Sequence, residues 1–378
     1  MKLVVIGYFL MDNTAQQPNN SQPVSNPISP TSTAQNPNQI VDKLKAKVAA
    51  AQLPVDVGEK IQDEVARIEL VFKTKDFNPE LDRQINYINF VCELPWNKIG
   101  QDNLDLNHAK QVLQKNHYGL EPLKARILEY LSILILNKQK GLTPKQPVLA
   151  FVGLAGSGKT TIAFSIAEAL GRPIIRIPFG GLGSALQLRG ESRVKSEAEP
   201  GMIAKAMKKA QVRNPVILID EIDRVTESAR TDIMGVLIEL LDPEQNMAFT
   251  DHYVGFPFDL SQVLFVATAN NTGNVATAVL DRLELIEMPF YTDEQKIVIG
   301  RDYLLPQALK NAGLDPQTIQ ISNQMWSSIV RPLGFDGGIR SLKRNITNMT
   351  GKIARMVVEG NKGPFIINEQ NLAQYLNI

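Results

Sequence analysis

The chain has 378 residues, which is enough for two or three domains. Its content of 44% hydrophobic and 21% charged residues is typical of a protein that buries a sizeable core. No apolar run approaches the roughly eighteen residues of a membrane span, and the net charge of +1 argues against nucleic acid as the main partner. The single cysteine, Cys92, excludes an internal disulfide framework and suits a reducing cytoplasmic location.

The N-terminal residues differ in composition from the rest. Residues 1–10 are too short for a convincing signal peptide, and Met11 is an alternative start. Residues 12–39 are rich in Asn, Gln, Pro, Ser and Thr and nearly free of large apolar side chains. Such a segment cannot bury enough surface to offset the entropy of ordering. We therefore expect a disordered tail over residues 1–39.

Apolar residues at helical spacing begin beyond this tail. Stripes start at Val41 and Ile61, and a third follows Asn78-Pro79, a good N-cap and N1 pair. These stripes predict a helical segment over residues 40–96. Cys92 falls on the third stripe, where the interpretation as a small core residue is favoured over a reactive thiol.

A strand, a glycine-rich loop and a helix are predicted in succession. Residues 147–152 form a short apolar run typical of a buried parallel strand, and residues 153–160 (GLAGSGKT) fit G-x-x-x-x-G-K-[ST]. Apolar residues at helical spacing follow until Gly171. This context indicates a phosphate-binding loop (P-loop). The residues expected to bind the nucleotide are Gly153, Ala155, Gly156, Ser157, Gly158, Lys159, Thr160 and Thr161.

The residue types of the P-loop match the chemistry of a nucleoside triphosphate. Glycines let backbone N–H groups converge on phosphate oxygens, and the helix N-terminus adds partial positive charge. Lys159 supplies a cation for the β- and γ-phosphates, and the Thr160 hydroxyl can ligate Mg²⁺. A charge pair at ~4 Å and an effective dielectric constant of ~20 is worth roughly 4 kcal/mol, so Lys159 should dominate affinity. ATP and Mg²⁺ are the predicted cofactors.

Three further strands are predicted, at residues 174–177, 216–221 and 263–270. They alternate with helices, which predicts a parallel, doubly wound α/β sheet with ligands at the carboxyl ends of the strands. Asp220 and Glu221 end one strand, where Asp220 would hold Mg²⁺ and Glu221 would act as general base on the attacking water. Asn270 ends another strand and would position that water, although many strands end in Asn.

From residue 291 onwards we expect an all-helical second domain. Thr292 and Gln295 form a capping box, and an apolar stripe from Ile339 to Met356 predicts a long helix. A short strand at residues 365–367 and a short helix are predicted at the end.

Two arginines have two interpretations on spacing alone. Arg282 precedes the apolar pair Leu285-Ile286, and Arg340 starts the long C-terminal helix. Either side chain could act on a nucleotide, Arg282 as an arginine finger on that of a neighbouring subunit. Spacing alone favours surface salt bridges.

The chain resembles the ATPase part of the Lon family of ATP-dependent proteases, within the AAA+ superfamily. The resemblance runs from about Val41 to the C-terminus. Its most specific stretches are LDPEQN at 241–246 and DHY at 251–253, accompanied by LPW at 94–96, HYGL at 117–120, TAN at 268–270, LDR at 280–282 and GIR at 338–340.

The resemblance implies a fold and roles for single residues. It implies an AAA+ P-loop domain over residues 97–290 and an α-helical lid over residues 291–378. With the family considered, a functional interpretation is favoured for both arginines. The matching positions are Tyr118 and Gly119 beside the adenine, Lys159 and Thr160 of Walker A, Asp220 and Glu221 of Walker B, Asn270 as sensor 1, Arg282 as the arginine finger and Arg340 as sensor 2.

The implied activity is ATP-driven remodelling or unfolding of damaged or unfolded proteins by a homo-hexameric ring with a central pore. The family's protease domain would begin just after Leu376, so we expect no peptidase activity from this chain and consider a separately encoded protease subunit as a partner. Two alternatives stay open. One is a regulatory or scaffold module that binds ATP without threading, and the other is a nucleic-acid-linked AAA+ ATPase, which the low net charge disfavours.

One segment departs from the family pattern. Between Gly190 and Gly201 the family carries an aromatic and then an aliphatic residue that grip the polypeptide, whereas Lys195 and Ser196 hold those positions here. A lysine stem covers some apolar surface but offers less desolvated contact than an aromatic ring. We therefore expect a weak, salt-sensitive grip that is biased towards acidic or already unfolded segments.

Overall fold

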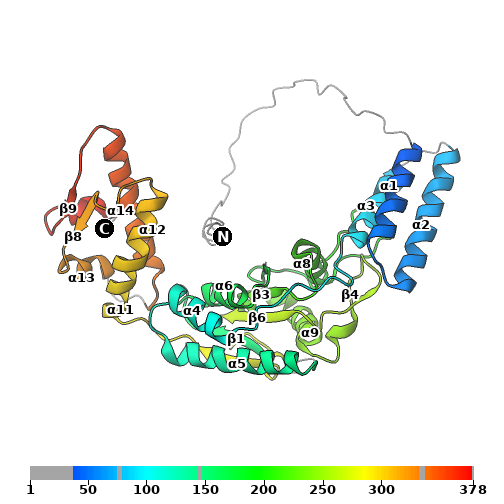
Figure 1. Cartoon of the computed structure of the whole chain (residues 1–378), viewed down its shortest axis with the longest axis horizontal. Coiled ribbons are helices and arrows are strands. Elements are labelled where there is room, and N and C mark those ends of the chain that lie inside the picture. Colours follow the sequence, from blue (N-terminus) through cyan, green and yellow to red (C-terminus); the bar gives the residue numbers. More distant parts are fainter. Residues whose placement is uncertain (1–36, 75–78, 143–146, 332–336, 377–378) are drawn as a thin grey trace.

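The structure is a computed structural model that describes residues 37–74, 79–142, 147–331 and 337–376. Three parts follow one another along the chain: a helical arm, an α/β domain and a C-terminal domain (Figure 1). Figure 1 shows the arm, in blue, and the C-terminal domain, in orange to red, at opposite ends of the α/β domain. Within the described ranges, no helix combines the length and apolar character needed to cross a membrane.

The arm consists of α1 (Pro37–Ala50), α2 (Val55–Thr74) and α3 (Pro79–Cys92), as the apolar stripes predict. Helix α1 begins at Pro37, so the predicted tail is wrong for residues 37–39. A helix needs a first turn ahead of its first buried side chain, and proline suits that turn. The rest of the predicted tail, residues 1–36, and the predicted cap Asn78 lie outside the described residues.

Cys92 lies in the core that the arm shares with the α/β domain. Its side chain is buried and free, and burial raises the pKa of the thiol to about 11. A thiol with so high a pKa stays protonated at neutral pH. The interpretation as a core residue is therefore confirmed.

The α/β domain is built on a five-stranded parallel sheet in the order β2-β3-β6-β1-β7. The strands are β1 (Val148–Val152), β2 (Ile174–Pro178), β3 (Val216–Asp220), β6 (Leu264–Ala269) and β7 (Leu283–Glu287). The three central strands are almost fully buried, because helices cover both faces of the sheet. The four strands predicted from the sequence are confirmed.

Successive residues of each strand pack into the cores on opposite faces of the sheet. Leu149 and Leu218 pack under α4 (Leu106–Asn116), α5 (Glu121–Gln139) and α6 (Lys159–Leu170). Ala150 and Ile217 belong to the core on the opposite face, with α8 (Met202–Ala210) and α9 (Arg230–Leu241). The shorter elements are α7 (Leu186–Arg189), α10 (Thr277–Leu280), β4 (Phe249–Thr250), β5 (Pro257–Phe258) and the 3₁₀ turns at Ile222–Arg224, Glu227–Ala229 and Asn246–Ala248.

In its described residues, the C-terminal domain packs four helical segments around one core. They are α11–η4–α12 (Asp293–Val298, Ile299–Leu304 and Leu305–Asn311), α13 (Met325–Val330), α14 (Arg340–Val358) and α15 (Leu372–Tyr375). The middle turn, η4, is π-helical and contains Gly300, where an added Cβ would come 2.7 Å from the ring of Trp326. The capping box of Thr292 and Gln295 is confirmed.

Four strands of the described residues were missed by the sequence reasoning: the two-residue strands β4 and β5, and the strands β7 and β8. The strand β8 (Ile319–Ile321) pairs in parallel with β9 (Phe365–Ile367), so the prediction of an all-helical second domain is wrong. A strand of three residues has too little period to be seen, and β9 requires a partner for its backbone groups. The edge strand β7 was also unassigned, because its two buried residues, Leu283 and Ile286, are three positions apart and do not show the period of two that marks a strand.

Candidate nucleotide-binding site

The P-loop leaves the carboxyl end of β1 and turns into α6. Gly156 and Gly158 have φ angles of 83° and 97°, a region in which residues with a Cβ are strained. Gly153 allows close approach as well, since an added Cβ would lie 2.9 Å from that of Met288. The loop therefore folds as the motif predicts, with backbone N–H groups at the N-terminus of a helix whose dipole favours anions.

Lys159 lies inside the P-loop and is only 7% exposed. Its Nζ donates to the carbonyl oxygens of Gly153 (2.6 Å) and Leu154 (2.9 Å) and to Oδ1 of Asn270 (3.2 Å). Burial lowers the pKa of Lys159, and the carboxylate of Asp220 acts in the opposite direction. The structure thus brings together a cation and an amide that the sequence places 111 residues apart.

Asp220 ends β3 with a buried carboxylate that accepts three hydrogen bonds. Oδ1 accepts from the hydroxyls of Thr160 (3.4 Å) and Thr268, and Oδ2 accepts from Nε of Arg176 (2.6 Å). The predicted pair of Thr160 and Asp220 is therefore in contact. Thr268 belongs to the TAN stretch but was given no role from the sequence, and Arg176 was not singled out. A polar residue within an apolar strand is the signal that could have indicated the importance of each of them.

Glu221 has a strained backbone. Its φ and ψ of 59° and 51° lie in the left-handed region, and its N–H donates to the hydroxyl of Thr268 (2.9 Å). A non-glycine residue held there persists only when its surroundings fix it, and such strain concentrates at functional sites. The Glu221 carboxylate lies 3.4 Å from the guanidinium of Arg224. It also lies beside Gly180, where an added Cβ would come 2.9 Å from a carboxylate oxygen of Glu221.

Two buried polar atoms at the site have no partner within the described residues. They are Nδ2 of Asn270 and the hydroxyl of Ser157. The backbone N–H of Asn270 donates to Asp223 (3.1 Å), which fixes where the amide points. A buried donor left without a partner costs about 1–3 kcal/mol, and phosphate oxygens are acceptors that would satisfy both groups. These orphan donors, with the glycine turns, Lys159 and the pair of Thr160 and Asp220, fit ATP and Mg²⁺.

The segment expected beside the adenine connects α4 and α5. Gly119 and Leu120 have φ angles of 64° and 61°, which turn the chain sharply. The ring of Tyr118 is 37% exposed and lies 6.4 Å from that of Tyr303 in η4. Gly119 also faces the C-terminal domain, because an added Cβ would lie 3.2 Å from Nε2 of Gln295.

His117 ties this segment to the helix behind the P-loop. Its Nε2 lies 2.9 Å from the hydroxyl of Ser165 in α6, and it also bonds to the backbone of Thr161. Burial lowers the pKa of His117 from 6.5 to about 4. The imidazole is therefore neutral near pH 7 and acts as a fixed hydrogen-bonding group.

The C-terminal domain contacts the P-loop through the start of α14. The N–H of Ile339 donates to the carbonyl of Gly156 (3.0 Å), and a Cβ added to Gly156 would come 2.9 Å from that of Arg340. Arg340 therefore stands directly over the P-loop. The structure thus places the start of α14 beside the P-loop, and the role of Arg340 as sensor 2 stays a prediction.

Arg282 lies at the other end of the sheet. It precedes β7, whose first residue, Leu283, pairs with Val148 at the start of β1, whereas the P-loop follows the end of β1. Within its own chain Arg282 pairs with Asp242 (2.8 Å) and donates to the carbonyl of Ala278 (2.8 Å). A strand of five residues spans about 16 Å, so Arg282 is not brought to the nucleotide site of its own chain.

Comparison with known proteins agrees with this geometry. Residues 149–290 match the model of the ATPase family associated with various cellular activities (AAA). The chain is 39% identical over 338 residues to a Lon protease from Halothermothrix orenii, covering 89% of this chain and 42% of that protein. For a Lon protease from Lawsonia intracellularis the identity is 40% over 339 residues, covering 89% of this chain and 40% of that protein.

A Lon protease from Clostridioides difficile is 39% identical over 340 residues, covering 90% of this chain and 42% of that protein. These matches identify a Lon-type AAA ATPase domain. The α/β class, the parallel sheet and the helical segments at both ends are confirmed with it. The chain spans about two fifths of the length of these curated Lon relatives.

Proposed function

We propose that this Lon-type domain hydrolyses ATP to drive the remodelling and unfolding of proteins. The observation that carries the proposal is the contact of the C-terminal domain with the P-loop, where Gly156 meets Ile339 and Arg340. A phosphate group gained or lost at the P-loop changes the charge beneath Arg340. Hydrolysis is thereby coupled to the orientation of a whole domain, which is what a mechanical task requires.

The proposed roles follow from the contacts. Lys159 and the P-loop amides bind the β- and γ-phosphates, and Thr160 with Asp220 holds Mg²⁺, which supplies positive charge to the phosphates when bound. Glu221 takes a proton from the attacking water, and Asn270 donates an amide N–H that orients it. Tyr118 and Gly119 lie beside the adenine of the bound nucleotide, and Arg340 contacts its phosphates from the C-terminal domain.

Arg282 gives the reason to propose an assembly. It lies away from its own P-loop, and Asp242 holds its guanidinium at the edge of the domain. We assign it to the nucleotide of a neighbouring subunit in a homo-hexameric ring. In this proposal the single-chain ion pair positions the arginine until a neighbour's phosphate replaces Asp242.

The proposed organisation has an arm at residues 40–96, a nucleotide-binding domain at 97–290 and a lid at 291–378. Unfolded or damaged protein is the substrate, and the segment from Glu191 to Glu199, called the 191–199 loop below, contacts it. A peptidase, either linked to this ATPase or separately encoded, would receive the unfolded chain. We place this activity, a form of protein quality control, in the cytoplasm, where the reducing conditions keep a free thiol such as that of Cys92 from oxidation.

ATP turnover with and without an unfolded protein such as casein tests this function, with the mass of the assembly measured in ATP. The proposal expects turnover that rises with the unfolded protein and a mass that corresponds to six chains. A regulatory or scaffold module would bind ATP and assemble, but its turnover would not respond to the polypeptide. That outcome would replace the proposal.

A further inference from the structure

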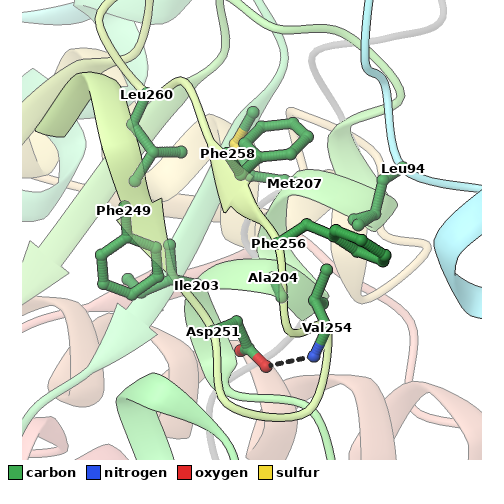
Figure 2. A pocket seen from close by; sticks show the side chains of 10 residues that line it. All are labelled: Leu94, Ile203, Ala204, Met207, Phe249, Asp251, Val254, Phe256, Phe258 and Leu260. Carbon is green, nitrogen blue, oxygen red and sulfur yellow. Dashed lines mark hydrogen bonds between the residues drawn. The ribbon is translucent and has the colours of Figure 1, made fainter. Parts of the chain in front are cut away.

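One buried carboxylate lies against both ends of the 191–199 loop and binds one of them. Asp251, which is 3% exposed, accepts from the N–H groups of Gly201 (2.8 Å) and Val254 (3.1 Å). Gly190 lies so close that an added Cβ would come 2.6 Å from Oδ1 of Asp251. Figure 2 shows Asp251 with its bond to Val254, at the edge of a small apolar cavity beside the turn that joins β4 to β5.

The middle of the same loop lies on the arm. The guanidinium carbon of Arg193 stands 3.6 Å from the ring centroid of Tyr87 in α3, and its Nη1 is 3.7 Å from Glu64 in α2. A cation within about 6 Å of an aromatic centroid is attracted to the ring face. Farther along the loop, Arg83 of α3 donates to the carbonyl of Ser196 (3.0 Å).

The ring that receives Arg193 is itself fixed. Tyr87 is 2% exposed, and its hydroxyl donates to the carbonyl of Val254 (2.9 Å). Tyr253 packs edge-on against that ring at 5.8 Å. The turn between β4 and β5 therefore holds the base of the loop through Asp251 and the arm through Tyr87. Arm, turn and loop share one set of contacts.

These contacts leave one apolar side chain free between the held positions. Val194 is 95% exposed, between Arg193 on the ring and Ser196 under Arg83. Lys195 is drawn back towards Glu191, with 3.5 Å between Nζ and the carboxylate. An isolated aliphatic side chain at the tip of a held loop is suited to contact an extended polypeptide through apolar surface.

We propose that α2 and α3 form a docking seat for the 191–199 loop, made by Glu64, Arg83 and Tyr87, and that the seat presents Val194 to the polypeptide. What Val194 contacts rests on the proposed function, whereas the seat does not. Arg193 and Tyr87 are positioning residues. A polypeptide or a neighbouring domain that displaces the arm also moves the loop.

Hydrogen exchange of the full chain, measured without nucleotide or polypeptide, tests the seat. The variants are Arg193→Gln and Tyr87→Leu, with Tyr87→Phe as the matched control that loses the hydroxyl but keeps the ring face. Amide exchange in residues 191–199 should be about fivefold faster in Arg193→Gln and Tyr87→Leu than in Tyr87→Phe, because only the first two variants lose the cation–π contact. Exchange in β6 serves as an internal reference for the fold.

Arg193 is partly exposed, with 40% of its side-chain surface accessible, so Arg193→Gln leaves the fold intact. Unchanged exchange of the loop in that variant overturns the seat. A second readout separates the seat from the proposed function. Tyr87→Leu should raise the concentration of unfolded casein that half-maximally stimulates ATP turnover, with basal turnover unchanged. If the exchange differs as expected but casein never stimulates the wild type, the proposed function fails and the seat stands.

Discussion

The nucleotide site and the 191–199 loop differ in what determines the position of their residues. At the nucleotide site, side chains from β3, β6 and α6 contact one another beside the start of α14, and the motif itself encodes the backbone turns. In the loop, Val194 points into solvent, and the position is set by residues of α2, α3 and the β4–β5 turn. Chemistry can thus be read from a local motif, whereas the placement of an exposed loop depends on distant contacts.

The largest effect is expected where the motif is most complete. Lys159→Ala should abolish ATP binding, because it removes the cation held inside the P-loop. Glu221→Gln should keep ATP bound but unhydrolysed, because the amide cannot take a proton. Calorimetric titration with ATP and turnover assays measure the two effects. Equal ATP affinity in wild type and Lys159→Ala would contradict the assignment of the P-loop as the nucleotide-binding site.

Arg282 tests whether the site is complete within one chain. Arg282→Ala should lower turnover by about 10³-fold while ATP binding to a single chain is retained. Asp242→Asn is the matched control, since it breaks the same ion pair and keeps the arginine. If Asp242→Asn costs as much as Arg282→Ala, the arginine is a structural salt bridge. Turnover per chain that stays constant on dilution to monomer would also exclude the role in trans.

His117 offers a smaller effect with a defined pH dependence. Its folded pKa of about 4 lies below the ordinary 6.5, so the unfolded chain binds the proton more readily. The neutral imidazole therefore contributes to the free energy of unfolding above pH 6.5. This contribution, about 3 kcal/mol, is lost as the pH falls towards 4. His117→Gln keeps a hydrogen-bonding side chain that does not titrate. Urea unfolding between pH 7 and 4 should show a flatter profile for the variant, and identical slopes would refute the assignment.

The smallest effect is expected in the loop. Lys195→Tyr/Ser196→Ile places an aromatic and an aliphatic side chain where the family has them, and it should increase unfolding of a stable substrate a few-fold at high salt. The wild type should lose activity between low and high salt, since screening weakens a lysine contact. Robust unfolding by the wild type at high salt, with no gain from the double change, would show that the loop already grips well.

The sequence predicted most of the nucleotide site, because each element there carries its own local signal. The P-loop glycines, the apolar run before Asp220 and the cap at Thr292 are all readable within a few residues. The roles of Thr268 and Arg176 were missed, since their importance lies in contacts with Asp220 on another strand. The roles of the site residues stay predictions until they are measured.

Elsewhere the local signal was too short or pointed to another residue. The strands β7 and β8 are five and three residues long, and pairing with distant strands defines them. Alignment drew attention to Lys195 and Ser196, but exposure singles out Val194, a residue whose surroundings are set by the arm. Contacts between residues separated by more than a hundred positions, such as Arg83 and Ser196, have no signature in a single sequence.

The central claim is that ATP hydrolysis in this domain does mechanical work on protein. Its most direct test follows the fluorescence of a stable, tagged fluorescent protein, in the presence of a trap for its unfolded form, with the full chain and ATP. The account predicts an ATP-dependent loss of fluorescence for the wild type and no loss for Glu221→Gln, which binds ATP without turning it over. Wild-type protein that hydrolyses ATP rapidly and leaves the fluorescence unchanged, for a range of tags, would contradict it.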